Sequence, residues 1–499
     1  MRRGSSLHAA LSLAGCLLLS PGCAWIPSQE HHAEYQAPPE MMETLSEVKD
    51  RLEHWPDERW WEQFGSAELN TLMAQALNEN PDVKIATARL NEAQNLVRVD
   101  GARLLPFLDA DASLTHERVS QRGVFNALSG GRVSGAHVLL GIINPLSFRY
   151  EFDFWGKNRS LMYAALGEAA AQEAERADIR LRLTAALARS YFRAFALQRQ
   201  WDLARQMVAI RREVHRLTEI RFRFGLDTEL AVQQAAIDLE TSKKREAGVR
   251  DQYDVQRYLL ARLSGRGPDA IPRLAGRTTG IPEGVPLPDH LAIGLLAHRP
   301  DLAASLYRAH AASERINVAK AQFLPSIDLT GFVGFNAVVP TKGADQLANL
   351  LFSGQSFAYG IAPGLRLPWF EGGRLRGELG ARRAEYDGAV ELYNQTLLEA
   401  AREVAASLSA WQSARDILAA HQRLLASANH DYRLTKVRLV GGLDDDRDVL
   451  RHRHPVLEQE YALRILESDQ LVAMVDLIEA LGGGYHNQDV DHKPEHHDN

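Results

Sequence analysis

Residues 80–109 read NPDVKIATARLNEAQNLVRVDGARLLPFLD, and residues 299–328 read RPDLAASLYRAHAASERINVAKAQFLPSID. The two stretches share prolines, aspartates and small residues at a constant offset. A second match follows in the same order, between LTEIRFRFGLD (217–227) and LTKVRLVGGLD (434–444). Because a repeat at a fixed period is the signature of a repeated structural unit, we expect each half of the chain to fold alike.

Each half is predicted to contain a helix, two strands and then two long helices joined by a turn. Proline is absent between Pro145 and Pro268 and between Pro368 and Pro455. Proline costs about 3 kcal/mol in a helix interior, so both tracts permit long helices. The stretch 156–224 would make roughly 70 residues of helix, on the order of 100 Å long.

An apolar stripe lies inside the first long tract. Its members are spaced alternately by four and three residues, as in a coiled-coil seam: Leu203, Met207, Ile210, Val214 and Leu217. Such a stripe alone also fits the core of a plain helical bundle. The length of the tract and the duplication favour a helical tube.

The predicted strands alternate between apolar and polar side chains. Tyr150, Phe152 and Phe154 point to one face, and Glu151 and Asp153 point to the other. Two strands per half give four strands per chain. Four strands leave open edges that lipid does not tolerate, so a membrane-spanning sheet would need several copies of the chain. Three copies would supply twelve strands.

The N-terminus reads as a secretion signal: a basic start, an apolar run from Leu7 to Leu19 and a cysteine. Two cysteines compete as the lipid attachment site. LAGC, ending at Cys16, is the better lipobox, whereas Cys23 leaves a signal of ordinary length and precedes a polar tether. We favour Cys23, with Cys16 and an unlipidated signal as alternatives.

Six motifs, in order, resemble the TolC-type outer membrane efflux protein family in its lipoprotein branch, and the resemblance covers nearly the whole mature chain. They are RWWEQF (59–64), YEFDFWGKNR (150–159), LAHRPDLAAS (296–305), AKAQFLPSIDLTG (319–331), LPWFEGGRLR (367–376) and ALGGGY (480–485). We interpret the Trp60–Trp61 pair and ALGGGY as packing elements, not as binding sites.

The resemblance implies a mainly α chain with a small β part. Internally duplicated long-helix hairpins would form an α-barrel, and three protomers would share one 12-stranded transmembrane β-barrel, with a mixed equatorial domain between. Gly156, Gly372 and Gly373 would lie at the strand–helix junctions, where glycine permits sharp redirection.

The resemblance also implies a role. The protein would be a passive exit duct for small toxic compounds in the cell outer membrane, both lipid-anchored and barrel-spanning, with a long periplasmic extension. Its partners would be two further copies, a periplasmic adaptor, an inner-membrane pump and outer membrane lipid. We expect no cofactor, only N-palmitoyl and S-diacylglycerol groups on the N-terminal cysteine. The net charge of −7 offers no basic stripe for nucleic acid.

We divide the chain into five parts by these features. They are a lipoprotein signal peptide (1–22), a lipid tether with an equatorial segment (23–58), a first structural repeat (59–275), a second repeat (276–485) and a disordered His-rich tail (486–499). Metal binding by the tail is conceivable, but a polar terminus is the simpler interpretation, and no metal site is predicted.

The second turn motif carries the candidate aperture of the duct. Family members place one aspartate six residues after the turn glycine and another three residues later. Asp448 matches the first position, whereas Arg451 reverses the charge at the second. Three further acids precede them, namely Asp444, Asp445 and Asp446. We hypothesise that these residues gate the duct; the alternative is a solvated turn whose acids favour a helix start. Pro455 predicts a kink or a late helix start.

Two other classes of protein fit the sequence less well. A periplasmic adaptor would show one helical hairpin and no barrel-type strands. An enzyme is not expected, because the sequence holds no Gly-rich phosphate loop, GxSxG elbow or HExxH pair.

Overall fold

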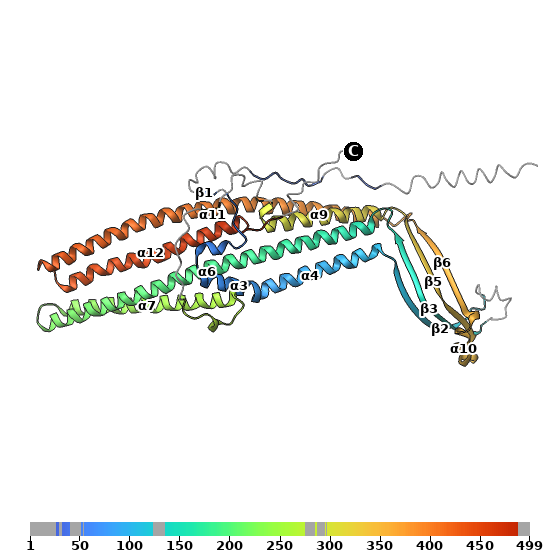
Figure 1. Ribbon diagram of the computed structural model, residues 1–499, viewed down its shortest axis with the longest axis horizontal. Coiled ribbons are helices and arrows are strands. Elements are labelled where there is room, and N and C mark those ends of the chain that lie inside the picture. Colours follow the sequence, from blue (N-terminus) through green and yellow to red (C-terminus); the bar gives the residue numbers. More distant parts are fainter. Residues whose placement is uncertain are drawn as a thin grey trace, which may run out of the picture. The chain divides into compact units, whose positions relative to one another are not determined.

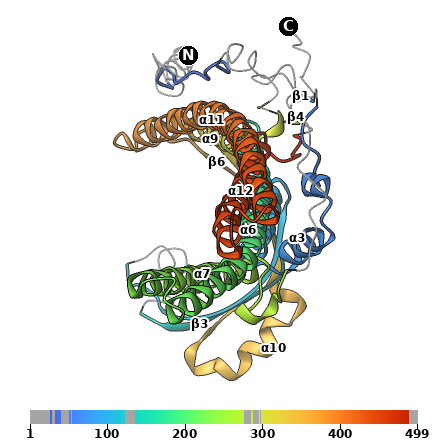
Figure 2. The ribbon, with the colours of Figure 1, turned by 90° about the vertical axis from the view of Figure 1, so that its left-hand side faces the viewer.

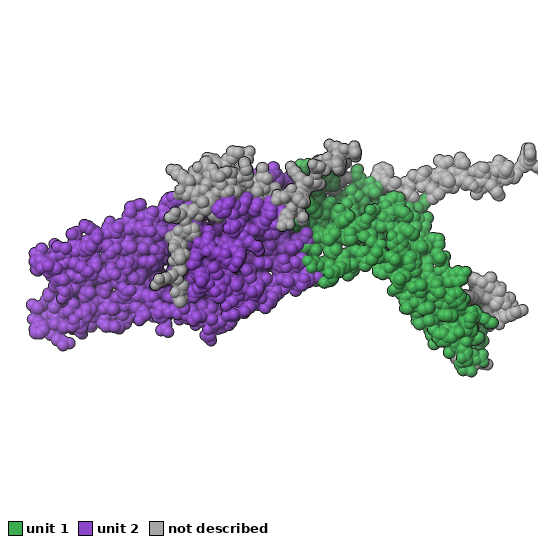
Figure 3. All heavy atoms as spheres, in the orientation of Figure 1, with its two compact units in different colours: residues 1–34, 92–169, 307–390 green, residues 35–91, 170–306, 391–499 purple. Residues whose placement is uncertain are grey.

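The computed structural model describes residues 26–28, 32–39, 51–52, 54–122, 135–274, 285–286, 295 and 297–487. The predicted signal peptide, Cys16, Cys23 and residues 488–499 of the tail lie outside this range. Two compact units make up the chain (Figure 3): one holds residues 1–34, 92–169 and 307–390, and the other holds residues 35–91, 170–306 and 391–499. Each unit takes segments from both halves, so the compact units and the sequence repeats are different divisions of the chain.

The first unit contains a four-stranded antiparallel sheet with two strands from each half of the chain. The order is β2 (Phe107–Arg118), β3 (His137–Phe152), β5 (Ser326–Pro340) and β6 (Phe357–Arg366). Strands β3 and β5, from different halves, pair in the middle, with Tyr150 opposite Leu329. The alternating side chains of β6 leave an apolar face exposed, at Phe357, Tyr359, Ile361 and Leu365.

A short connection between β5 and β6 was not predicted. It consists of a 3-10 turn (Thr341–Gln346), helix α10 (Leu347–Leu351) and another 3-10 turn (Gly354–Ser356). Leu347 and Leu351 bury against Ala337 and Val339 of β5, so this connection covers one end of the sheet with apolar side chains.

The helices occur in matched pairs (Figure 1). Helices α4 (Pro81–Gly101) and α9 (Pro300–Ala321) precede the strands, and α6 (Lys157–Arg223) and α11 (Arg374–Val440) follow them. Both α6 and α11 have 67 residues, while α7 (Glu229–Leu263) and α12 (Asp446–Ala480) each have 35. This confirms the predicted fold class: a mainly helical chain with duplicated long-helix hairpins and a small β part.

In the second unit, α11, α12, α6 and α7 follow one another in a curved layer, with α3 (Ala67–Glu79) on the convex side (Figure 2). The main core lies here and includes Tyr191, Phe192, Met474 and Leu477, all almost fully buried. The predicted coiled-coil stripe of α6 lies outside this main core. Its residues Leu203 and Met207 form a small buried cluster with Leu457 of α12.

RWWEQF and ALGGGY pack into this unit. Trp60 and Trp61, in a 3-10 turn (Trp60–Phe64), are buried in the core. Gly482 has a φ of 89°, and a Cβ there would collide with the carbonyl of His298. Two short segments form a parallel pair: β1 (Arg51–Leu52) from the N-terminal segment and β4 (Val285–Pro286) from the linker between the repeats.

One sequence expectation needs correction. Helix α12 begins at Asp446 and continues through Pro455, so the helix does not start late. The capping box of Asp445 and Asp448 fixes the start instead, which leaves a kink as the prediction for Pro455. None of the described helices combines the length and the apolar character needed to cross a lipid bilayer.

Candidate functional site: the two helical turns

The two hairpin turns are built by the same backbone device. Gly225 follows α6 and Gly442 follows α11, with φ of 69° and 73°, a left-handed conformation that favours glycine. In each turn the amide after the glycine donates a hydrogen bond to the last turn of the preceding helix. Leu226 donates to the carbonyl of Arg221 at 2.8 Å, and Leu443 donates to the carbonyl of Arg438 at 2.9 Å. This pattern ends the helices sharply and aims the following residues back along the hairpin.

Each turn also contains an internal ion pair at the same repeat position. Arg221 Nε donates to Asp227 at 3.0 Å, and Arg438 Nε donates to Asp444 at 2.7 Å. The hydrogen bond from Arg438 holds the pKa of Asp444 below its usual range. The predicted gate residue Asp444 is therefore engaged within its own turn.

The second turn starts α12 with a capping box. The Asp445 carboxylate accepts from the Asp448 amide at 2.9 Å, and the Asp448 carboxylate accepts from the Asp445 amide at 3.2 Å. These reciprocal bonds satisfy amides that a helix N-terminus leaves unpaired. Asp446 is the first residue of α12, where its charge favours the helix dipole. Arg451 lies 3.6 Å from Asp448 and is half exposed.

Ion pairs also join the two turns to each other. Arg447 donates to Asp227 at 2.6 Å, and the Arg221 guanidinium lies 3.4 Å from Asp445. The side chains of Arg447 and Asp227 are only 12% and 17% exposed. Burial favours the neutral form of Asp227, but hydrogen bonds and charges from Arg221 and Arg447 outweigh it and lower its pKa.

Sequence reasoning missed Arg447. The repeat pairs Asp227 with Asp444, and the same offset pairs Leu230 with Arg447. The sequence signal for Arg447 was that an arginine in the second repeat occupies the position of a leucine in the first. What the sequence did not show is that the arginine reaches the acid of the other turn.

Large apolar side chains surround this charged network at the ends of the hairpins. Within the described residues they are exposed by 63–90%: Phe224, Leu226, Leu230, Val440 and Leu443. A cluster of exposed apolar side chains is typical of a surface that another protein covers.

The predicted junction glycines lie between the sheet and the long helices. Gly156 separates β3 from α6, and Gly372 and Gly373 separate β6 from α11, all with positive φ. Asp153 starts α6 by accepting from the amides of Asn158 and Arg159, at 2.9 and 3.0 Å.

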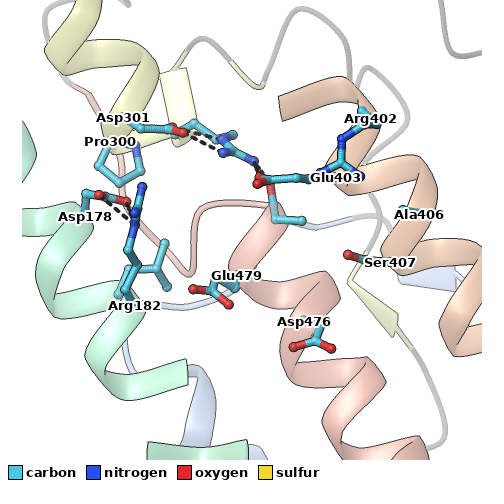
Figure 4. Close-up of a pocket in the computed structure, with 13 residues that line it drawn as sticks. Asp178, Arg182, Pro300, Asp301, Arg402, Glu403, Ala406, Ser407, Asp476 and Glu479 are labelled. Atoms are coloured by element: carbon cyan, nitrogen blue, oxygen red, sulfur yellow. Dashed lines mark hydrogen bonds and ion pairs between the residues drawn. The ribbon is translucent and has the colours of Figure 1, made fainter. Parts of the chain in front are cut away.

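A charged pocket lies in the second unit where α6, α9, α11 and α12 meet (Figure 4). Arg299, before α9, is buried and donates to Asp301 at 2.6 Å and to the carbonyl of Ala480 at 3.0 Å, and it pairs with Glu403 at 2.8 Å. Burial opposes its charge, but the carboxylates of Asp301 and Glu403 outweigh that effect and raise the pKa of Arg299.

The same pocket holds a weaker pair on α6. Asp178 and Arg182 lie 2.9 Å apart, and burial raises the pKa of Asp178 to about 6. The charged groups of the pocket bind one another, and the contacts of Arg299 join α9, α11 and α12, which favours a structural role over ligand binding.

No group of three or more His, Cys, Asp or Glu side chains within the described ranges is arranged to hold a metal ion. Of the tail histidines, only His486 is described, and its ring lies 5.0 Å from that of His298.

Comparisons with known proteins agree with this architecture. The family model described as "Outer membrane efflux protein" matches residues 72–266 and again residues 293–483. The chain is 28% identical over 489 residues to the multidrug resistance outer membrane protein MdtP of Shigella flexneri, covering 95% of this chain and 96% of that protein. It is 28% identical to the pyoverdine export outer membrane protein OpmQ of Pseudomonas putida, covering 96% and 97%.

A solved structure is similar over most of the chain. The outer membrane protein VceC of Vibrio cholerae superposes with a TM-score of 0.74 at 32% identity, covering 87% of this chain and all of that one.

Proposed function

We propose that this chain, which belongs to the outer membrane efflux protein family and is an outer membrane efflux channel, works as a homotrimer in a tripartite pump. In this proposal it is a passive duct for small toxic compounds, docked to a periplasmic adaptor and an inner-membrane pump. The observation that carries the proposal is the double family match, which covers both repeats together with their strands and hairpins.

The four-stranded sheet supports the trimer. Its outer strands, β2 and β6, each leave one edge unpaired within the described chain. Lipid cannot satisfy the free backbone groups of an open edge, so pairing β6 of one copy with β2 of the next removes the cost. Three copies would then supply twelve strands.

The exposed apolar side chains at the hairpin ends support a docking partner. A protein such as the adaptor would cover Phe224, Leu230 and Val440, which are exposed by 76–90%. The duct itself would do no work on its cargo, because the energy would come from the inner-membrane pump. The relatives named for multidrug resistance and for pyoverdine export leave the cargo class broad.

Lipidation of the N-terminal cysteine is a further part of the proposal. A single acyl chain binds a membrane weakly, so palmitoyl and diacylglyceryl groups on Cys23 would act with the barrel as anchors. Mass spectrometry of the mature N-terminal peptide distinguishes modification at Cys23 from modification at Cys16. An unmodified N-terminus would contradict this part alone.

The gate proposal assigns the closed tip to the charged turn residues. Asp448 and Arg451, with Asp444, Asp445 and Asp446, would form acidic and basic rings around the axis of three copies. Single-channel recording tests it: Asp448→Ala and Arg451→Ala should open more often than the wild type. Two variants with unchanged conductance and unchanged open probability would reject this role.

The channel function has a direct test. Outer-membrane fractions should yield a heat-modifiable trimer that conducts ions in planar bilayers, and a strain lacking the gene should become sensitive to toxic compounds. The alternative, a periplasmic adaptor, would give neither a heat-modifiable trimer nor conductance.

A further inference from the structure

His454 lies on α12 at the place where the two hairpins pack together. Its side chain is 15% exposed, and its Nε2 lies 3.4 Å from the Glu458 carboxylate one turn later. Its Nδ1 is buried and has no hydrogen-bond partner within the described part of the chain. A buried ring nitrogen without a partner favours the neutral imidazole, because the imidazolium needs an acceptor at both nitrogens.

Two ion pairs lie near this ring, one within the other hairpin and one between the two hairpins. Arg211 of α6 donates to Asp238 of α7 at 3.2 Å. Arg245 of α7 donates to Glu458 of α12 at 2.6 Å, so this pair ties the hairpins together. These two cations and two anions face His454 from three helices and balance in charge while the ring is neutral.

A proton on His454 would disturb that balance. Burial, and then the charge of Arg211, hold the pKa of His454 below its ordinary value of 6.5, although Glu458 acts in the opposite direction. The packing in this structure therefore binds the proton less well than an arrangement in which the ring is solvated, and we take this packing as the closed state of the tip.

The helix is weakened at the same point. Pro455 follows His454 inside α12 and has no amide hydrogen, so the carbonyl of Arg451 loses its helical donor. Helices bend readily at such positions. A change in the packing of His454 thus occurs at the place where α12 bends most readily.

We propose that His454 is a proton-sensitive contact between the two hairpins, and that its protonation loosens α12 from α6 and α7 and favours an open tip. The inference rests on the proposed channel function. The sign follows from linkage: a depressed pKa in the closed state stabilises that state fully above the ordinary histidine pKa. This stabilisation is lost as the pH falls below it.

Single-channel recording at pH 7.5 and pH 5.5 tests the proposal. The wild type should show a severalfold higher open probability at pH 5.5, limited to about tenfold for each unit of pKa difference. His454→Gln should remove most of this response, and His454→Leu gives a second non-titrating variant if the first does not assemble. His452→Gln is the matched control, because His452 is exposed and pairs at 2.8 Å with Asp431 of its own hairpin.

A wild type without a pH response, or an equal response in His454→Gln, would overturn the proposal. An equal loss in His452→Gln would overturn it as well, since a general effect of removing charge would then explain the result. Amide exchange of residues 446–461, corrected for its intrinsic pH dependence, gives a readout that needs no conductance. Exchange should accelerate at pH 5.5 in the wild type and not in His454→Gln, which separates failure of this inference from failure of the channel proposal.

Discussion

The turn between α6 and α7 and the turn between α11 and α12 share a framework and differ in what they contact. Each has a left-handed glycine, an internal Arg–Asp pair and a capping residue. The first turn has Thr228 and Leu230 where the second has Asp445 and Arg447. Asp445 and Arg447 each contact a charged group of the first turn.

The difference shows how a duplication can diverge without loss of the fold. Positions that build the turn stayed the same, because a different residue at Gly225 or Gly442 would strain the backbone. Two positions near the neighbouring hairpin differ, and each turn now donates one bond and accepts one: Arg221 donates to Asp445, and Arg447 donates to Asp227. Substitutions at Arg447, Asp445 and Thr228 test what the difference between the turns does.

The largest change in the open-to-closed ratio of the tip is expected from Arg447→Leu, which gives the second turn the residue of the first. It removes the bond to Asp227, which is still held by Arg221. After allowance for solvent screening, we expect a loss of about 1 kcal/mol of closed-state stability, or roughly fivefold in the open-to-closed ratio. Single-channel recording measures this ratio.

The control for Arg447→Leu is Lys244→Leu, which removes an exposed cation of α7. An open-to-closed ratio that changes equally in both variants would mean that the bond between the turns does not hold the tip closed.

A smaller effect is expected from Asp445→Thr, which gives the second turn the capping residue of the first. The threonine hydroxyl can still accept from the Asp448 amide, and Asp448 can still accept in return, so the capping box survives. Only the 3.4 Å contact with Arg221 is lost. An exposed ion pair is worth about 0.4 kcal/mol, so the open-to-closed ratio should change by about twofold. A change larger than that of Arg447→Leu would reverse the order of the two contacts.

The sequence was sufficient for features that repeat or follow a short period. The duplication, the long proline-free tracts and the strand alternation predicted matched helices and two strands per half. The acids around Asp445 and Asp448 also indicated a helix start, the alternative to a gate, and the structure shows the two side chains in a capping box. The bond between Arg447 and Asp227 joins residues 220 positions apart, and no local pattern indicates which acid a particular arginine will reach.

The smallest effect on the open tip is expected from Thr228→Ala. Its hydroxyl accepts from the Ala231 amide at 3.2 Å and caps α7, and losing a cap costs about 1 kcal/mol of helix stability. Among the described residues, the Thr228 side chain bonds to its own helix and not to the second turn, whereas Asp445 reaches Arg221, so this cost should remain local to the first turn of α7. Amide exchange at Ala231 and its neighbours should become about fivefold faster, while the open-to-closed ratio changes by less than twofold. If the ratio instead changed as much as in Arg447→Leu, the cap itself would control the tip, and the contacts between the turns would be a consequence of closure, not its cause.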